Sequence, residues 1–170
     1  MDYGQIWRMA KTPIVLLALL ALVLIAGRWG YAAMTAPLPP PYVEPCVDQP
    51  VPDGVLRSDM VTVKIYNASN KRGKASEVSQ QLQLQGFKVS AVGNAEQNQE
   101  KSVIIGFATD SPEVELVHQQ FEGFERVADG RRDHSVEVLI GGNYESMIGD
   151  APTELKIDGQ SLCLPQPPAA

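Results

Sequence analysis

The sequence predicts an α+β domain with the β-α-β-β-α-β order of a ferredoxin-like sandwich, behind one N-terminal transmembrane helix. Two observations lead to this prediction. An uncharged apolar run near the N-terminus has the length of a membrane span. After a proline-rich segment, short stretches of alternating apolar residues enclose two stretches of helical periodicity. We therefore expect two helices over one face of an antiparallel sheet, in one domain with one core.

The N-terminal apolar run extends from Pro13 to Gly27. With its flanks, a helix over residues 12–34 reaches the ~20 residues that a hydrocarbon core requires. Residues 1–11 carry a basic excess and nearly the whole chain follows them. We therefore expect residues 1–11 in the cytoplasm, and the rest of a single-pass protein outside the plasma membrane. A cleaved signal peptide is the alternative, although no A-x-A pattern precedes Pro37.

Residues 35–59 predict a stiff extracytoplasmic spacer. Seven prolines lie between Pro37 and Pro52, and each proline fixes its own φ and pushes the preceding residue toward an extended backbone. Such a segment adopts polyproline II, at about 3.1 Å per residue. We expect it to hold the following domain away from the membrane. Docking of a partner that recognises proline motifs is the alternative.

The first half of the predicted domain, which spans residues 60–150, contains a strand, a helix and a second strand. The segment VTVKIYN, which begins at Val61, alternates apolar residues like a strand with one buried side. The next segment places Ala75, Val78 and Leu82 at i, i+3 and i+7, which is the apolar stripe of a helix. A glycine follows its last turn, as at many helix ends. The segment FKVSAV then alternates as the second strand.

The second half repeats this pattern. KSVIIGFA predicts a strand over residues 102–108, and DSPEVELVHQQF predicts a helix capped by Ser111, with proline at its first position. Val114, Val117 and Phe121 repeat the apolar stripe. FERVA predicts one additional short strand, and SVEVLIGG predicts the last strand of the domain.

Residues 151–164 predict a C-terminal hairpin that precedes a tail over residues 165–170. Two short alternating runs flank Asp158 and Gly159, and an Asp-Gly pair in that position is typical of a tight hairpin turn.

The chain has two cysteines, Cys46 in the predicted spacer and Cys163 in the predicted hairpin. Two lone cysteines that flank one domain in an oxidising compartment are expected to pair, so we predict a Cys46–Cys163 disulfide. A bond between two chains is the alternative. A zinc site would need more ligands, and we expect no metal or cofactor.

The turn after the first predicted strand lacks two requirements of a phosphate-binding loop. The pattern G-x-x-x-x-G-K-[ST] would align with Gly73 and Lys74. It would then require glycine where the chain has Ala68, and a hydroxyl ligand for Mg²⁺ where it has Ala75. We therefore expect no nucleotide.

This part of the chain instead resembles the LytR C-terminal-type domain, which occurs in LytR-CpsA-Psr cell-wall proteins and in single-span envelope proteins of actinobacteria. The resemblance covers about residues 61–144. It is carried by VTVKIYNAS, the spacing of Asn67, Gly73 and Ala75, and then GFKV, VSAVGNA and VEVLIGGNY. Ala68 stands where the family usually has glycine. The order of span, spacer, single domain and cysteine-bearing tail is similar to actinobacterial envelope integrity proteins. This similarity implies a role in maintaining the cell envelope.

The residues themselves favour a binding module over an enzyme. His118 and His134 have no cysteine or carboxylate cluster at ligand spacing, and the chain has no G-x-S-x-G motif. Two of the 14 basic and one of the 20 acidic residues precede Arg28, which leaves a net charge of −7 from there onward. Such a charge disfavours nucleic-acid binding.

One candidate surface is basic. Lys71, Arg72 and Lys74 gather at the predicted start of the first domain helix, where free backbone N–H groups and the helix dipole favour anions. With Asn67 and Ser69 of the preceding turn they form a candidate site for an anion or a partner. Ordinary solvated charge is the alternative.

A second candidate surface is apolar. Leu84 and Leu116 lie roughly opposite the apolar stripes of their helices. They could form exposed contacts for a partner. The C-terminal hairpin or the spacer could cover them instead.

These observations predict a membrane-anchored, non-enzymatic domain that supports the cell envelope by binding wall polymer or an envelope protein complex. Direct recognition of peptidoglycan glycan strands is the alternative, by analogy of fold alone. An enzyme with a dispersed site is the third possibility.

Overall fold

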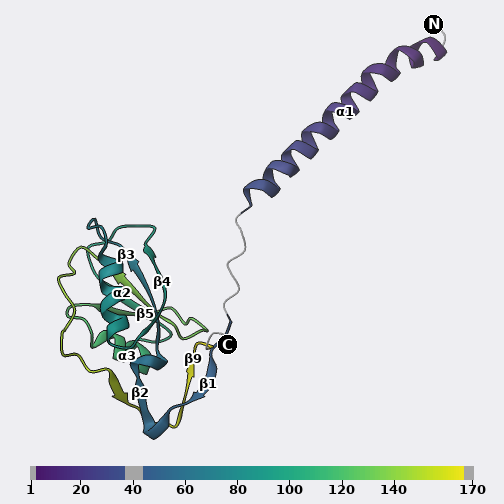
Figure 1. Cartoon of the computed structure of the whole chain (residues 1–170). Coiled ribbons are helices and arrows are strands. Elements are labelled where there is room, and N and C mark those ends of the chain that lie inside the picture. Colours follow the sequence, from purple (N-terminus) through teal and green to yellow (C-terminus); the bar gives the residue numbers. More distant parts are fainter. Residues whose placement is uncertain (1–2, 37–43, 167–170) are drawn as a thin grey trace. The chain divides into compact units, whose positions relative to one another are not determined.

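The computed structural model describes residues 3–36 and 44–166, and the chain divides into two units, residues 1–42 and 43–170 (Figure 1). The first unit contains helix α1 (Tyr3–Thr35). Its segment Pro13–Thr35 is 23 residues long and apolar enough to cross a membrane. At 1.5 Å per residue this segment measures about 35 Å, compared with ~30 Å for a hydrocarbon core. By length and composition the helix is a candidate membrane span, close to the predicted bounds.

The second unit is built on a five-stranded sheet in the order β4-β3-β7-β5-β6. Its strands are β3 (Thr62–Asn67), β4 (Lys88–Asn94), β5 (Val103–Gly106), β6 (Glu125–Ala128) and β7 (Val136–Ile140). Helix α2 (Lys74–Leu84) connects β3 to β4, and helix α3 (Pro112–His118) connects β5 to β6. The α+β class, the order of the elements and the additional short strand are confirmed.

The predicted ferredoxin-like pairing of the strands is wrong. β3 is parallel to both β4 and β7, and β5 is parallel to β6, so only β5 and β7 are antiparallel in this sheet. Each helix returns the chain directly beside the strand that it left, as in a βαβ unit, and leaves no gap for a third strand. β7 then lies between β3 and β5 and joins the two βαβ units. Because it is parallel to β3 and antiparallel to β5, the sheet is mixed.

One core lies between this sheet and its two helices. The two apolar stripes are buried as predicted, and they pack into the same cluster as the inward side chains of β3, β5 and β7. The residues of the sheet and of the two stripes in this cluster include Val63, Ile65, Val78, Leu82, Ile104, Val114, Val117, Phe121, Val136, Val138 and Ile140. Both helices therefore cover one face of the sheet, as predicted, and the side chains of the opposite face lie outside this core.

The residues that flank the domain form an antiparallel ribbon of two short sheets. β1 (Val47–Pro50) pairs with β9 (Ser161–Leu164), and β2 (Val55–Arg57) pairs with β8 (Glu154–Lys156). The 3-10 helix η1 (Pro52–Gly54) lies between β1 and β2, and a second one, η2 (Ser58–Met60), precedes β3. Backbone hydrogen bonds continue across the bend between the two sheets.

This ribbon corrects two predictions. Residues 47–57 are not part of an extended spacer, because they form two strands whose Val51 and Leu56 are buried. Nor do β8 and β9 form a hairpin with each other, since each pairs with a strand from the opposite end of the domain. A two-stranded ribbon consists of edge strands, which tolerate the prolines that suggested a spacer. Residues 37–43 of the predicted spacer lie outside the described residues.

The predicted disulfide is confirmed. Cys46 and Cys163 are bonded within the chain, with their Cα atoms 5.3 Å apart and a separation of 117 residues in sequence. Cys46 directly precedes β1, and Cys163 lies in β9, so the bond closes the outer end of the ribbon.

Candidate functional site

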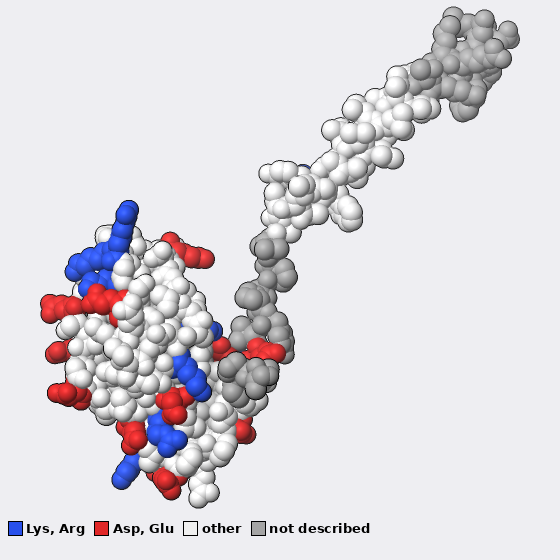
Figure 2. All heavy atoms as spheres, in the orientation of Figure 1, with Lys and Arg blue, Asp and Glu red and all other residues white. Residues whose placement is uncertain are grey.

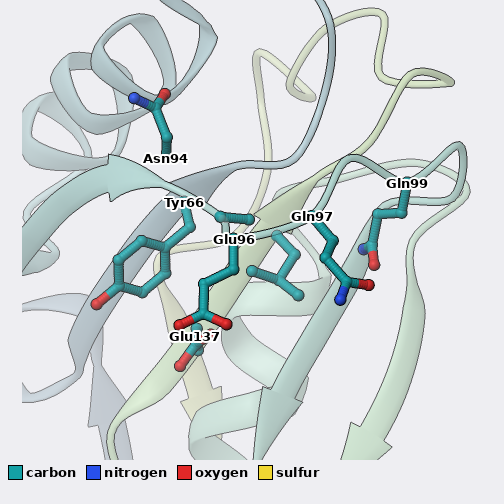
Figure 3. Close-up of a pocket in the computed structure, with 8 residues that line it drawn as sticks. Tyr66, Asn94, Glu96, Gln97, Gln99 and Glu137 are labelled. Atoms are coloured by element: carbon teal, nitrogen blue, oxygen red, sulfur yellow. The ribbon is translucent and has the colours of Figure 1, made fainter. Parts of the chain in front are cut away.

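A groove opens on the sheet face away from the helices, where the parallel strands β4, β3 and β7 reach their carboxyl ends. It has a volume of about 560 Å³. Its walls come from these three strands and from the loop that follows β4. The lining residues are Tyr66, Asn94, Ala95, Glu96, Gln97, Gln99, Glu137 and Leu139 (Figure 3).

The floor of the groove is an aromatic ring beside an aliphatic side chain. Tyr66 on β3 is in register with Gly93 on β4 and with Leu139 on β7. A Cβ atom at Gly93 would lie 3.3 Å from the Tyr66 ring, so a glycine there gives the ring room against the sheet. The groove therefore offers a flat apolar surface with a phenolic hydroxyl at its end.

Two carboxylates face the same space. Glu137 projects from β7, and Glu96 comes from the loop after β4; both carboxylates and the Tyr66 ring lie on one side of the sheet in Figure 3. Arg131 Nη2 lies 3.3 Å from Glu137 Oε2. Among the residues that the structure describes, Glu96 forms no ion pair, so the groove has an acidic wall with free acceptor oxygens.

Backbone hydrogen bonds hold the loop that forms one wall of the groove. The N–H groups of Ala95 and Gln99 donate to the carbonyls of Asn67 and Ala68, at 2.9 and 2.7 Å. On its other side, Gly142 N–H donates to Gln99 O at 3.0 Å. The loop is therefore fixed between the turn after β3 and the turn after β7.

The turn after β3 is built by two of the predicted site residues. Asn67 Oδ1 accepts hydrogen bonds from the backbone N–H of Ser69 (3.1 Å) and from its hydroxyl (2.7 Å), and Asn67 Nδ2 donates to Lys71 O (2.8 Å). Both side chains are buried. Asn67 and Ser69 thus use their polar atoms to shape the turn, which corrects the expectation that they are available to a ligand. Gly73 completes the turn at φ +81°, where glycine is favoured.

The turn after β7 explains the paired glycines of the VEVLIGGNY segment. A Cβ atom at Gly141 would lie 2.5 Å from the backbone carbonyl of Lys101, and one at Gly142 would lie 2.5 Å from the Glu100 carboxylate. Asn143 Oδ1 accepts hydrogen bonds from the backbone N–H and the hydroxyl of Ser102, at 2.9 and 2.7 Å. The turns after β3 and β7, which belong to two of the segments that carry the family resemblance, therefore lie at the same end of the sheet.

The three predicted basic residues lie beside this region. Figure 2 shows Lys and Arg side chains gathered at one end of the domain, with Asp and Glu side chains among them. Lys71 and Arg72 are exposed, as a ligand site would require. Lys74 is engaged, since its Nζ lies 2.7 Å from Glu77 and 5.7 Å from the centre of the Tyr144 ring. Anion binding by these residues stays a prediction.

The two predicted apolar contacts differ. Leu84 is 89 % exposed at the end of α2 and stays a predicted partner contact. Leu116 is 0 % exposed, so the prediction that it forms an exposed contact is wrong. β8, which lies within the predicted C-terminal hairpin segment, packs against α3, in line with the alternative that this segment covers Leu116.

Comparison with known proteins identifies the domain. A family model for the LytR C-terminal domain, described as LytR cell envelope-related transcriptional attenuator, matches residues 60–144, which is half of the chain. The chain belongs to this family. No curated protein matched it. A solved structure that resembles it is the soluble domain of a conserved hypothetical secreted protein from Mycobacterium marinum. That likeness has 22 % identity and a TM-score of 0.49, and covers 54 % of this chain and 66 % of that one.

The LytR C-terminal domain match contains the whole groove and excludes both cysteines. Next to the disulfide lies a cluster that sequence analysis missed. His134 Nδ1 is 2.9 Å from Glu113 Oε1, and its ring stacks on Phe107 with 4.3 Å between the ring centres. The sequence shows no ligand spacing around His134, but the fold brings Glu113 and both cysteines close to it. No spacing in the sequence signals this cluster, because its members come from four separate segments.

The loop before β7 connects this cluster to the groove. Arg131 forms an ion pair with Asp129 and extends to Glu137. The hydrogen bond from the Arg131 guanidinium holds the pKa of Asp129 below its usual range. Asp129 therefore stays ionised near neutral pH, and its ion pair, together with the contact to Glu137, keeps Arg131 at the edge of the groove.

Proposed function

We propose that the protein is a single-pass, membrane-anchored domain of the cell envelope that binds wall polymer, with its N-terminus in the cytoplasm and its groove outside. Three observations support the location. α1 contains a candidate membrane span, the chain belongs to a family described as cell envelope-related, and the domain contains a disulfide. Disulfides persist in extracytoplasmic compartments and are rare in the cytosol.

The chemistry of the groove carries the proposal for the ligand. An aromatic ring packs well against the C–H face of a sugar, and carboxylates and amides pair with neighbouring hydroxyl groups. The groove supplies the Tyr66 ring, the carboxylates of Glu96 and Glu137, and the amides of Gln97 and Gln99. Its acidic wall disfavours a phosphate-bearing polymer. We therefore propose a neutral or amino-sugar segment of wall glycan as the ligand.

The shape of the groove supports binding rather than catalysis. It is open along the sheet face, so a polymer can lie across it without threading. The residues that position its walls act through backbone hydrogen bonds and small side chains, which fix a surface for recognition.

The ligand is testable by retention on purified, insoluble cell wall with the full-length protein in detergent. Tyr66→Ala should weaken retention at least about tenfold, which corresponds to ~1.4 kcal/mol. Glu96→Gln and Glu137→Gln should each weaken it less, because an amide keeps one acceptor oxygen. Glu154→Gln, at an exposed position in β8, is the matched control. Retention of Tyr66→Ala equal to that of the parent would exclude the groove as the glycan site.

An envelope protein partner is the second candidate, and the exposure of Leu84 favours it. Crosslinking in intact membranes with a photoreactive residue at position 84 should then capture a discrete protein. Leu84→Ser should abolish a specific contact while leaving wall retention unchanged. Capture that persists at the same level in a photoreactive variant at exposed Gln81 would argue against a specific interface.

The anchor has its own test. An uncleaved helix keeps the full-length chain in the membrane fraction, with the domain accessible to protease from outside. A mature N-terminus between Met34 and Pro37 would instead identify the apolar run as a signal peptide.

A further inference from the structure

The disulfide lies next to an imidazole that can complete a metal site. The Sγ atoms of Cys46 and Cys163 and a ring nitrogen of His134 all lie within 4.8 Å of one another. All three residues are half-buried, so a bound ion would be partly shielded from water. Two thiolates and one imidazole are the ligand set of open zinc sites, which keep a fourth position for water.

Several contacts hold the imidazole of His134 in place. Glu113 Oε1 occupies its Nδ1 at 2.9 Å, and the Phe107 ring stacks against its face. The backbone of His134 has φ +52°, an uncommon conformation for a residue other than glycine. Because Nδ1 is engaged, Nε2 is the nitrogen with a free lone pair.

Glu113 has the position of a carboxylate that supports a metal-bound histidine. Its side chain is 1 % exposed, and its Oε2 has no hydrogen-bond partner among the residues that the structure describes. A ligating histidine almost always donates its other ring N–H to such a carboxylate, which fixes the ring and strengthens the ligand. A buried carboxylate with an unpaired oxygen is otherwise costly.

We propose that reduction of the Cys46–Cys163 disulfide converts this cluster into a zinc site formed by both thiolates and His134 Nε2. Tetrahedral bonds of about 2.3 Å to sulfur and 2.0–2.1 Å to nitrogen separate two sulfur ligands by about 3.8 Å, and sulfur from nitrogen by about 3.6 Å. The three ligand atoms lie within 4.8 Å of one another, so the sulfur–nitrogen separations need only a small adjustment, whereas the two sulfur atoms must move apart once their bond is broken. Rotation of the two cysteine side chains provides this movement.

The conversion has a simple balance. A dithiol reductant transfers two electrons and two protons to the disulfide, which yields two cysteine thiols and the oxidised reductant. Zn²⁺ then displaces the two thiol protons and binds the thiolates, while neutral His134 provides its lone pair. Disulfide and zinc therefore exclude each other, and the site exists only in the reduced protein.

The fold keeps the ligands together after reduction. Cys46 N–H donates to Arg132 O at 2.7 Å, and Asp48 remains in register with Cys163 in the β1–β9 pair. The loop that carries His134 has its own support, because the hydroxyl of Ser135 donates to Asp133 at 2.8 Å. None of these hydrogen bonds depends on the disulfide.

Cobalt binding tests the site in the full-length protein in detergent. The chain is reduced with a phosphine, the excess is removed, and Co²⁺ is added while thiolate-to-cobalt charge-transfer absorption is recorded. We expect one Co²⁺ per reduced chain, displaced by an equal amount of Zn²⁺, and no such band for the oxidised chain. Zn²⁺ should also raise the Tm of the reduced chain and slow its reoxidation.

Three variants separate the site from general effects. His134→Asn should weaken zinc binding at least about tenfold, and asparagine tolerates the positive φ, so the fold should persist. Glu113→Gln should weaken it about 10-fold or more by removing the carboxylate. His118→Ala, which changes the other histidine, should leave it unchanged.

Three results would overturn the proposal. They are a reduced parent that binds no cobalt, a His134→Asn variant that binds as tightly as the parent, and a reduced chain that is unfolded and that zinc does not refold. Binding of Cu⁺ but not Zn²⁺ would also overturn the proposal of a zinc site, although the same three ligands would then hold another metal.

Discussion

The two ends of β7 are held in place by different means. At its carboxyl end, the turns after β3 and β7 are joined by hydrogen bonds between backbone and small polar side chains, such as Asn67, Ser102 and Asn143. At its amino end, the ribbon is closed by a covalent bond beside His134. At the first end, Gly141 and Gly142 leave no room for a Cβ atom, and no cysteine takes part. The second end depends on a bond that reduction breaks.

The two ends of β7 also differ in their relation to the family match. The carboxyl end lies within the segment that matches the LytR C-terminal domain, and both cysteines of the amino end lie outside it. The groove is therefore a property of the family segment, whereas the disulfide cluster depends on the flanking residues of this chain. The following predictions separate the two ends.

The largest effect is expected at the amino end. Replacing both Cys46 and Cys163 by serine should lower the free energy of unfolding by about 4 to 5 kcal/mol, because the disulfide closes a loop of more than a hundred residues. Urea unfolding of the oxidised parent and the double variant measures this difference. Wall retention of the folded double variant should equal that of the parent. Loss of retention would show that the two ends are coupled.

A smaller but comparable effect is expected at the carboxyl end. Gly141→Ala should lower the free energy of unfolding by about 2 to 4 kcal/mol, because its Cβ would lie 2.5 Å from the Lys101 backbone, which cannot rotate away. Gly149→Ala is the matched control, since nothing lies within 4 Å of a Cβ there. It should be neutral or slightly stabilising. Equal stability of the two variants would mean that the turn after β7 is not closely packed.

Sequence reasoning succeeded where the signal is local. A helix is predicted by the spacing of Ala75, Val78 and Leu82 alone, and all three side chains are buried in the core. The partner of each strand is not local. Alternation in Val136 to Ile140 predicts a strand, but it does not say that this strand enters the sheet between β3 and β5.

The ribbon and the two sites show the same limit. The burial of Val51 and Leu56 was not predicted, because they lie in a proline-rich segment whose composition alone does not distinguish a spacer from an edge strand. Glu96 and Glu137 come together only through the parallel pairing of β3 with β4 and β7. His134 lies near Cys46 only because β1, which precedes the domain, pairs with β9, which follows it.

A pH dependence distinguishes the carboxyl end further. Tyr144 follows the Gly-Gly turn, and burial raises the pKa of its hydroxyl to about 12. An unfolded tyrosine titrates near 10, so between pH ~10 and ~12 the unfolded chain releases a proton that the folded chain retains. The contribution of Tyr144 to the free energy of unfolding is therefore fully present below pH ~10, and this free energy falls by about 2 to 3 kcal/mol as the pH rises to ~12.

Tyr144→Phe removes this titration and should flatten that part of the stability profile, measured by urea unfolding at each pH. The Tyr144 hydroxyl has no hydrogen-bond partner among the described residues, so the variant should be as stable as the parent or more stable at pH 7. An unchanged alkaline loss in the variant would assign that loss to another group.

The smallest effect on stability is expected from the basic residues beside the groove. Changing Lys71, Arg72 and Lys74 to glutamine should alter the free energy of unfolding by less than about 1 kcal/mol, since surface ion pairs contribute little. If these residues bind an anionic envelope group, the variant should be retained less on envelope extracts at low salt.

Two comparisons interpret this last result. Gly73→Val should lower stability without changing retention by the folded fraction, because valine is strained at φ +81°. Undiminished retention of the triple glutamine variant on every extract at low salt would reject the anion site.

The ribbon also determines how the domain carries mechanical load. In a protein that is anchored in the membrane and bound to the wall, tension enters the domain at its amino-terminal end, directly before β1. Pulling there would peel β1 from β9 one hydrogen bond at a time, which is the weakest way to load an antiparallel pair. The bond from Cys46 to Cys163 transfers that tension to both strands at once, before the first hydrogen bond is loaded. Reduction of this disulfide would therefore lower the force that is needed to separate β1 from β9.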